Sequence, residues 1–193
     1  VPMEGWTRDM YADATGLPWV MPSPNMPTLD TAIAYPGTVL FEGTLLSEGR
    51  GTTRPFELVG APWIDAERFA AEMNGLGLPG VYFRPAGFEP TFQKHAKQPC
   101  GGCQIHVTDR TSFRPLMTGV ALIDLFRRHD PARSTWRQPP YEYEHDKMPI
   151  DILAGSDTLR TQIESGVPIR EIAASWKDDE GEFGRLRKPF LMY

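Results

Sequence analysis

Residues 104–129, QIHVTDRTSFRPLMTGVALIDLFRRH, place a short β-branched segment before the clearest helical pattern of the chain. The segment Gln104–Thr108 is typical of a strand. Pro115 suits the first turn of a helix to about His129, because a proline there loses no intrahelical hydrogen bond. The basic residues at its end favour the negative pole of the helix, and its buried stripe is formed by Leu116, Val120, Ile123 and Phe126. This order predicts a domain that combines sheet and helices.

Further short elements are predicted upstream of this pair. Strands are expected at residues 37–41, 56–59 and 81–83. Helices are expected at residues 29–35 and 65–74. Thr28 and Asp65 are the expected N-caps, Pro36 the expected stop of the first helix, and Pro85 an expected interruption of the third strand. Nineteen prolines and eighteen glycines predict long loops between these elements, including 18–27.

The last third of the sequence predicts a loop followed by short helices. Residues 130–149 are polar and broken by prolines, which indicates a loop or linker. One helix would end at Gly166 and another would start at Pro168. We therefore predict an α+β fold with a mixed sheet of short strands, packed helices, long Pro/Gly-rich loops and a helical C-terminal tail. The predicted division is an α+β domain at 1–129 and a linker with packed helices at 130–193.

Composition excludes several classes of protein. The 193 residues carry a net charge of −5, and 40% are hydrophobic and 23% charged, as in an ordinary folded domain. The basic residues are scattered, so nucleic acid is not an expected partner. No apolar run approaches the roughly 18 residues that cross a bilayer, so no membrane span is expected. The beginning, VPMEGW, lacks an initiator methionine and a signal core, which predicts a start within a longer protein.

Residues 41–53, FEGTLLSEGRGTT, have the composition of a binding loop. Two acids, one arginine and four hydroxyl side chains stand among glycines. Glycines let a backbone approach a ligand, hydroxyls and arginine donate to sugar oxygens or a carboxylate, and a glutamate can act as acid or base. The same residues also fit a surface ion pair between Glu48 and Arg50 joined by turns. The spacing does not match a phosphate-binding loop.

Cys100 and Cys103 form a C-x-x-C pair, which elsewhere holds zinc or exchanges thiols. Zinc would need further ligands, and His95 and His106 are the nearby candidates. His106 follows Cys103 by three residues on a predicted strand, so their side chains should face opposite sides. A redox pair usually opens a helix, whereas this pair precedes a strand. We expect buried thiols or a local disulfide, and no metal.

Two segments resemble the NamZ family of exo-β-N-acetylmuramidases. They are residues 22–65, PSPNMPTLDTAIAYPGTVLFEGTLLSEGRGTTRPFELVGAPWID, and residues 91–109, TFQKHAKQPCGGCQIHVTD. The resemblance implies hydrolytic removal of N-acetylmuramic acid from the non-reducing end of peptidoglycan fragments, without a cofactor. Family members are about twice as long, with a Rossmann-like N-terminal domain, a smaller auxiliary domain and a cleft between them. This chain resembles the auxiliary half only, and alone it is expected to be inactive.

The resemblance also implies roles for individual residues. The family's main catalytic glutamate belongs to the missing domain, the expected partner, because no FGPEH-like segment is found here. Glu42 or Glu48 could lend a second carboxyl group, and Arg50 could contact the lactyl carboxylate of muramic acid. Further expected substrate contacts are Asn25, Ser47, Thr52, Thr53, His95 and Gln104. For His95 the alternative is a packing role.

Other functions stay open at this stage. The chain could be a non-catalytic carbohydrate-binding or assembly module that acts without a Rossmann-like partner. A thiol or zinc protein built around Cys100 and Cys103 comes last. The family resemblance implies a periplasmic or secreted location rather than a cytoplasmic one.

Overall fold

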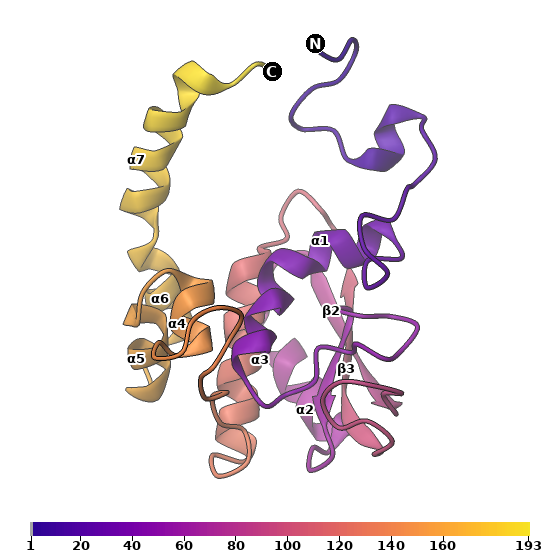
Figure 1. The fold of residues 1–193 in the computed structure, drawn as a ribbon, viewed down its shortest axis with the longest axis vertical. Coiled ribbons are helices and arrows are strands. Elements are labelled where there is room, and N and C mark those ends of the chain that lie inside the picture. Colours follow the sequence, from indigo (N-terminus) through magenta and orange to yellow (C-terminus); the bar gives the residue numbers. More distant parts are fainter. Residues whose placement is uncertain (1) are drawn as a thin grey trace.

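A small antiparallel sheet lies at one side of the body, in a computed structural model that describes residues 2–193 (Figure 1). Its strands, in the spatial order β1-β3-β2, are β1 (Leu58–Ala61), β3 (Cys100–Val107) and β2 (Val81–Phe88). Helices pack against this sheet, so the predicted α+β class and the helical C-terminal end are confirmed. The expected mixed sheet is wrong in one respect, because both strand pairs are antiparallel.

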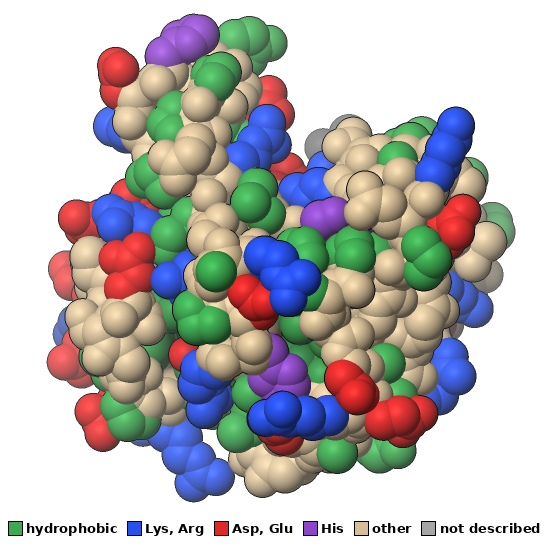
Figure 2. All heavy atoms as spheres, turned by 90° about the horizontal axis from the view of Figure 1, so that it is seen from below, with side chains coloured by type: hydrophobic (Ala, Val, Ile, Leu, Met, Phe, Trp, Pro, Cys, Tyr) green, Lys and Arg blue, Asp and Glu red, His purple; other side chains and the backbone are tan. Residues whose placement is uncertain are grey.

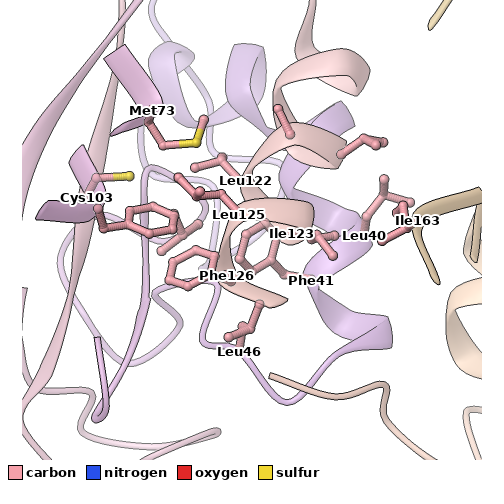
Figure 3. Close-up of a cluster of buried hydrophobic side chains, with 14 of the residues drawn as sticks. Leu40, Phe41, Leu46, Met73, Cys103, Leu122, Ile123, Leu125, Phe126 and Ile163 are labelled. Carbon is pink, nitrogen blue, oxygen red and sulfur yellow. The ribbon is translucent and has the colours of Figure 1, made fainter. Parts of the chain in front are cut away.

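Two helices enclose the main core against the sheet. Helix α2 (Ala66–Gly75) packs on β2 and β3, and α3 (Pro115–His129) packs against α2. The Phe126 ring stacks on Phe69 with centroids 4.0 Å apart and meets Phe41 edge-on at 5.9 Å. Figure 3 shows Phe126 and neighbouring side chains of α3 facing Phe41, Leu46 and Met73. The predicted bounds of α3 are confirmed, as is the Asp65 cap of α2, whose carboxylate accepts from the Arg68 amide at 3.0 Å.

Helix α1 (Leu29–Thr38) runs through the predicted stop at Pro36. It begins as expected, with the Thr28 hydroxyl accepting from the Thr31 amide at 3.2 Å. A Cβ on Gly37 would lie 1.9 Å from the Pro115 carbonyl oxygen, and one on Gly119 would lie 2.2 Å from the Gly37 carbonyl oxygen. This close contact between α1 and α3 keeps the backbone helical past the proline. The predicted strand 37–41 is therefore wrong; α1 continues into the 3-10 helix η2 (Val39–Gly43).

Strand β2 also continues through a predicted interruption. Pro85 lies within the strand opposite Cys103. An edge strand tolerates proline because part of its N–H groups face away from the neighbouring strand. The order β1-β3-β2 places β2 at an edge, so the expected break at Pro85 is wrong.

The residues after α3 return to the same core. The predicted loop 130–149 ends one residue earlier than expected, because Pro149 begins α4 (Pro149–Ala154), a helix that the sequence did not predict. The two helices that follow, α5 (Thr158–Glu164) and α6 (Ile169–Ser175), were both predicted. Ile150, Ile163 and Ile172 are buried in the cluster that also holds Leu122 and Ile123. The C-terminal helices therefore pack on the core, while the division at residue 129 stays a prediction.

Two arms extend from this body (Figure 1). We call residues 2–21 the N-terminal arm; the C-terminal arm is residues 177–193, with α7 (Lys177–Arg187) and η3 (Lys188–Phe190). Their ends meet: the Tyr193 hydroxyl accepts from the Met3 amide, and its ring lies 4.8 Å from Trp6, edge-on. Both arms expose apolar side chains, among them Leu17, Val20, Met21, Phe183, Leu186, Phe190 and Met192.

Within residues 2–193, no helix has the length and the apolar composition that crossing a bilayer requires. On the face seen from below, acidic and basic side chains lie side by side among hydrophobic ones (Figure 2). The same mixture is found in the recess between the two lobes that protrude at the top of this view. Charges of both signs are thus mixed over this face.

Candidate functional site

The site is built on the turn-rich segment that connects η2 to β1. Helix η2 ends one residue after Glu42, and Ser47 forms a bridge with Gly60 on β1, which ties the segment to the sheet. Gly49 and Gly51 have φ of 74° and 84°, values that side chains with a Cβ rarely adopt. These two glycines turn the chain so that the side chains before and after Gly49 converge.

Among the side chains that come together around Gly49, Glu42 lies nearest the surface. The Arg50 Nη2 atom donates to Glu42 Oε1 at 2.6 Å, and the Tyr141 hydroxyl donates to Glu42 Oε2 at 2.7 Å. The Glu42 side chain keeps 13% of its surface exposed. Both carboxylate oxygens are thus held by donors, while part of the side chain stays exposed. The contact with Glu42 and burial raise the pKa of Tyr141, burial being the larger cause, so the hydroxyl stays a donor.

Glu48 lies deeper, with 2% of its surface exposed. The Lys94 Nζ atom donates to Glu48 Oε2 at 2.9 Å and also to the carbonyl oxygens of Phe41 and Leu46, at 2.7 and 3.0 Å. Arg50 Nη1 lies 3.5 Å from Glu48 Oε1. Burial lowers the pKa of Lys94, and the Glu48 charge opposes that shift. All three donors of the ammonium group are in use, so this pair fixes the loop.

The arrangement gives the two glutamates different capacities. Glu42 is partly exposed, whereas Glu48 is buried between Lys94 and Arg50, and Arg50 also binds Glu42. Arg50 connects them, and its guanidinium lies over the Phe56 ring, 5.1 Å from the centroid. With both carboxylates already paired to it, Arg50 acts on Glu42; its predicted contact with a substrate carboxylate stays a prediction.

The other predicted loop residues mostly serve the loop itself. The Ser47 amide donates to the Gly60 carbonyl oxygen at 2.8 Å, and its buried hydroxyl accepts from the Gly49 amide at 3.1 Å. The Thr52 hydroxyl donates to the Gly49 carbonyl oxygen at 2.6 Å. Thr52 and Thr53 also line a shallow hollow of about 610 Å³ beside Phe88 and Phe92. Neither threonine is hydrogen-bonded to Glu42 or Glu48.

His95 lies near the cluster, and its neighbours explain why. Its Nε2 atom is 2.8 Å from the Leu45 carbonyl oxygen, and its ring meets Trp63 edge-on at 5.3 Å. Burial lowers the pKa of His95, and the adjacent Lys94 charge acts in the same direction. These contacts match the packing alternative.

Asn25 and Gln104 make their contacts elsewhere. The backbone N–H of Asn25 donates to the Ser23 hydroxyl in the loop before α1. Gln104 accepts from the Arg84 guanidinium at 2.8 Å, across β3 and β2. Neither is hydrogen-bonded to the glutamate cluster, and their roles as substrate contacts stay predictions.

The cysteines are both free and buried. Cys100 and Cys103 both lie on β3, three residues apart, so their side chains face opposite sides of the sheet and the expected local disulfide does not form. Burial raises the pKa of the Cys100 thiol to about 11, and the pKa of Cys103 is raised further. The buried thiols are thus a structural feature of the sheet. Among residues 2–193, no group of three or more His, Cys, Asp and Glu side chains could hold a metal ion.

Sequence reasoning missed Lys94 and Tyr141, which complete the cluster. Lys94 is far from Glu48 in the sequence, and Tyr141 is farther still from Glu42. For the segment around Tyr141 the sequence predicts only a polar, proline-broken loop. A lone lysine or tyrosine carries no local pattern, so only the fold could place them.

Comparison with known proteins gives a single family. A profile described as "Exo-beta-N-acetylmuramidase NamZ, C-terminal" matches residues 33–193, and the corresponding N-terminal profile matches residues 1–30. The chain is 44% identical over its whole length to "Peptidoglycan beta-N-acetylmuramidase NamZ" of Bacillus subtilis (strain 168), of which it covers 45%. It therefore spans about half the length of this curated relative.

Two solved structures of DUF1343 family proteins from Bacteroides fragilis NCTC 9343 have a similar fold. One matches 98% of this chain and 49% of its own, with a TM-score of 0.84 and 27% identity. The other matches 89% of this chain and 43% of its own, with a TM-score of 0.63 and 26% identity. The sequence resemblance is thus confirmed, and the chain belongs to the NamZ exo-β-N-acetylmuramidase family.

Proposed function

We propose that this chain is the C-terminal part of a peptidoglycan β-N-acetylmuramidase and supplies one wall of its substrate site. The observation that carries the proposal is the Glu42 carboxylate, partly exposed and held at both oxygens by Arg50 and Tyr141. The name of the Bacillus subtilis relative supports the substrate class.

Glycoside hydrolysis commonly uses two carboxyl groups on either side of the scissile bond. We assign the second of these groups to Glu42 and the principal acid to the N-terminal part of the longer protein. A carboxylate oriented by two donors can stabilise positive charge that develops on the sugar ring, or can position a water molecule. Glu48 and Lys94 act indirectly, since they fix the loop that carries Glu42 and Arg50.

The first test is Glu42→Gln in the full-length protein, with a chromogenic β-N-acetylmuramide as substrate. The amide keeps the size of the side chain but removes its charge, so we expect kcat to fall roughly 100-fold or more. Tyr141→Phe, which removes one of the two donors, should lower kcat by a smaller factor.

The matched control is Glu67→Gln, which neutralises an exposed glutamate in the first turn of α2 and should leave kcat unchanged. Equal turnover by the Glu42→Gln and wild-type proteins would contradict the catalytic role of Glu42. A full-length protein that binds muramyl sugars without cleaving them would instead support the alternative of a carbohydrate-binding module.

We further infer that the two arms pack against the N-terminal part of the longer protein. Residues 1–30 match the N-terminal family profile. An ion pair between Arg110 Nη1 and Asp13 Oδ2, 2.5 Å apart, joins the N-terminal arm to the body. The exposed apolar side chains gather on the two arms, where Phe183 and Leu186 are each 62% exposed. Exposed apolar side chains that gather on one part of a protein commonly mark an interaction site.

The double change Phe183→Asp and Leu186→Asp tests this packing. In the 193-residue chain the two side chains are exposed, so we expect little change in the free energy of unfolding. In the full-length protein the same change should destabilise by about 2–4 kcal/mol, since two buried apolar side chains are lost. Chemical denaturation of both proteins measures the difference. Arg185→Ala on the same helix is the control, and equal small effects in both proteins would exclude the packing.

A further inference from the structure

The segment 135–137 brings the cationic side chain of Arg137 to the edge of the glutamate cluster. It runs antiparallel to residues 43–45: the Leu45 amide donates to the Thr135 carbonyl oxygen at 3.0 Å, and the Arg137 amide donates to the Gly43 carbonyl oxygen at 2.9 Å. The bridge between Thr44 and Trp136 lies between these bonds. Trp136 is buried, and because successive side chains alternate along such a segment, Arg137 points to the opposite side.

The Arg137 guanidinium lies over the Tyr141 ring, 5.2 Å from the centroid. The hydroxyl of the same tyrosine donates to Glu42 at 2.7 Å. The Arg137 charge is also close enough to act on the Lys94 ammonium group. Arg137 thus lies at the rim of the same cluster as Glu42, held by a stacked aromatic ring and by its own backbone.

The charges of the cluster leave Arg137 uncompensated. Glu42 and Glu48 carry two negative charges, and Arg50 and Lys94 carry two positive charges, all joined by the ion pairs already described. Arg137 forms no ion pair with any residue in the described part of the chain, 2–193, and its side chain is partly exposed. A partly exposed cation that lies over a tyrosine ring and has no carboxylate partner among residues 2–193 is suited to bind an anionic group of a ligand.

We propose that Arg137 binds the carboxylate of the lactyl group on muramic acid and thereby selects muramyl sugars over sugars without that group. This assignment rests on the proposed function and moves the carboxylate contact from Arg50, which is paired to both glutamates, to Arg137. Arg137 is then a specificity residue: it binds a part of the substrate that does not react. Such a contact acts equally in the ground state and the transition state, so it affects KM more than kcat.

The test uses two substrates that differ in one charge: a chromogenic β-N-acetylmuramide with a free lactyl carboxylate, and its lactyl methyl ester. In the full-length wild-type protein we expect kcat/KM to be roughly tenfold to 100-fold higher for the acid, the range for a hydrogen bond to a charged group. Arg137→Ala should raise KM for the acid by a similar factor, leave kcat nearly unchanged and leave the ester unaffected, so that the preference disappears. Arg137→Lys should retain part of it.

Lys147→Ala is the matched control, because it removes one positive charge from an exposed position in the same loop and should keep the acid preference. An acid preference that persists in Arg137→Ala while turnover is normal would overturn the assignment of Arg137 and leave the proposed function standing. Absence of turnover in the wild-type full-length protein would instead contradict the proposed function itself. Equal loss for acid and ester in Arg137→Ala would indicate a merely structural role and would also overturn the assignment.

Discussion

Replacement of Lys94 by methionine is expected to destabilise the protein by about 3–5 kcal/mol, the range for removal of one partner from a buried ion pair. Methionine fills a similar volume but leaves the Glu48 carboxylate, which is 2% exposed, with Arg50 alone at 3.5 Å. The carbonyl oxygens of Phe41 and Leu46 lose their donor as well. Chemical denaturation followed by circular dichroism measures the loss, and the melting temperature should fall by on the order of 10 °C.

The double variant Lys94→Met, Glu48→Gln is the control for this explanation. If the cost of Lys94→Met comes from an uncompensated buried charge, neutralising Glu48 should restore part of the lost stability. The two changes would then be clearly non-additive, as expected for residues in direct contact. Simple additivity would show that the Lys94–Glu48 pair is not what stabilises the loop.

The second large effect is expected for Gly119→Ala, with a loss of about 3 kcal/mol from overpacking. The added methyl group would lie 2.2 Å from the Gly37 carbonyl oxygen, a backbone atom that cannot rotate away. Helices α1 and α3 would have to separate, and the segment that carries Glu42 follows directly after α1. We therefore expect both a lower free energy of unfolding and reduced turnover in the full-length protein.

Gly184→Ala provides the control for this change. A Cβ at this position in α7 meets no atom within 4 Å, and alanine in a helix is favoured over glycine by up to about 1 kcal/mol. Its stability should be unchanged or slightly higher. A Gly119→Ala protein as stable as the wild type would show that α1 and α3 do not depend on this close contact.

Sequence patterns predicted the elements that local chemistry determines. Helix α3 has a proline at its start, a spaced apolar stripe and basic residues at its end, and each of these signals lies within the helix itself. The Asp65 cap and the start at Pro168 are of the same kind. Patterns failed where a distant element decides. Residues 37–41 are apolar and β-branched as in a strand, yet Gly37 lies against α3 and the backbone there remains helical.

The candidate site divides in the same way. Glu42, Glu48 and Arg50 are close in the sequence, and their convergence follows from the glycines between them. Lys94, Arg137 and Tyr141 come from loops whose positions depend on the sheet and on the packing after α3. The sequence left Arg50 open to either a substrate carboxylate or a pair with Glu48, and it gave no signal for Arg137, whose position depends on the pairing of residues 135–137 with 43–45.

Both free edges of the sheet carry features that oppose growth by strand addition. Strand β1 has four residues, and Gly60 on it exchanges hydrogen bonds with Ser47, which covers part of that edge. Strand β2 contains Pro85, whose nitrogen offers no donor to an incoming strand. Self-association of the isolated chain should therefore occur through the apolar arms and not through amyloid-like extension of the sheet. In concentrated solutions of the isolated chain, covering the apolar side chains of the arms should therefore reduce self-association more than changes to the strands would.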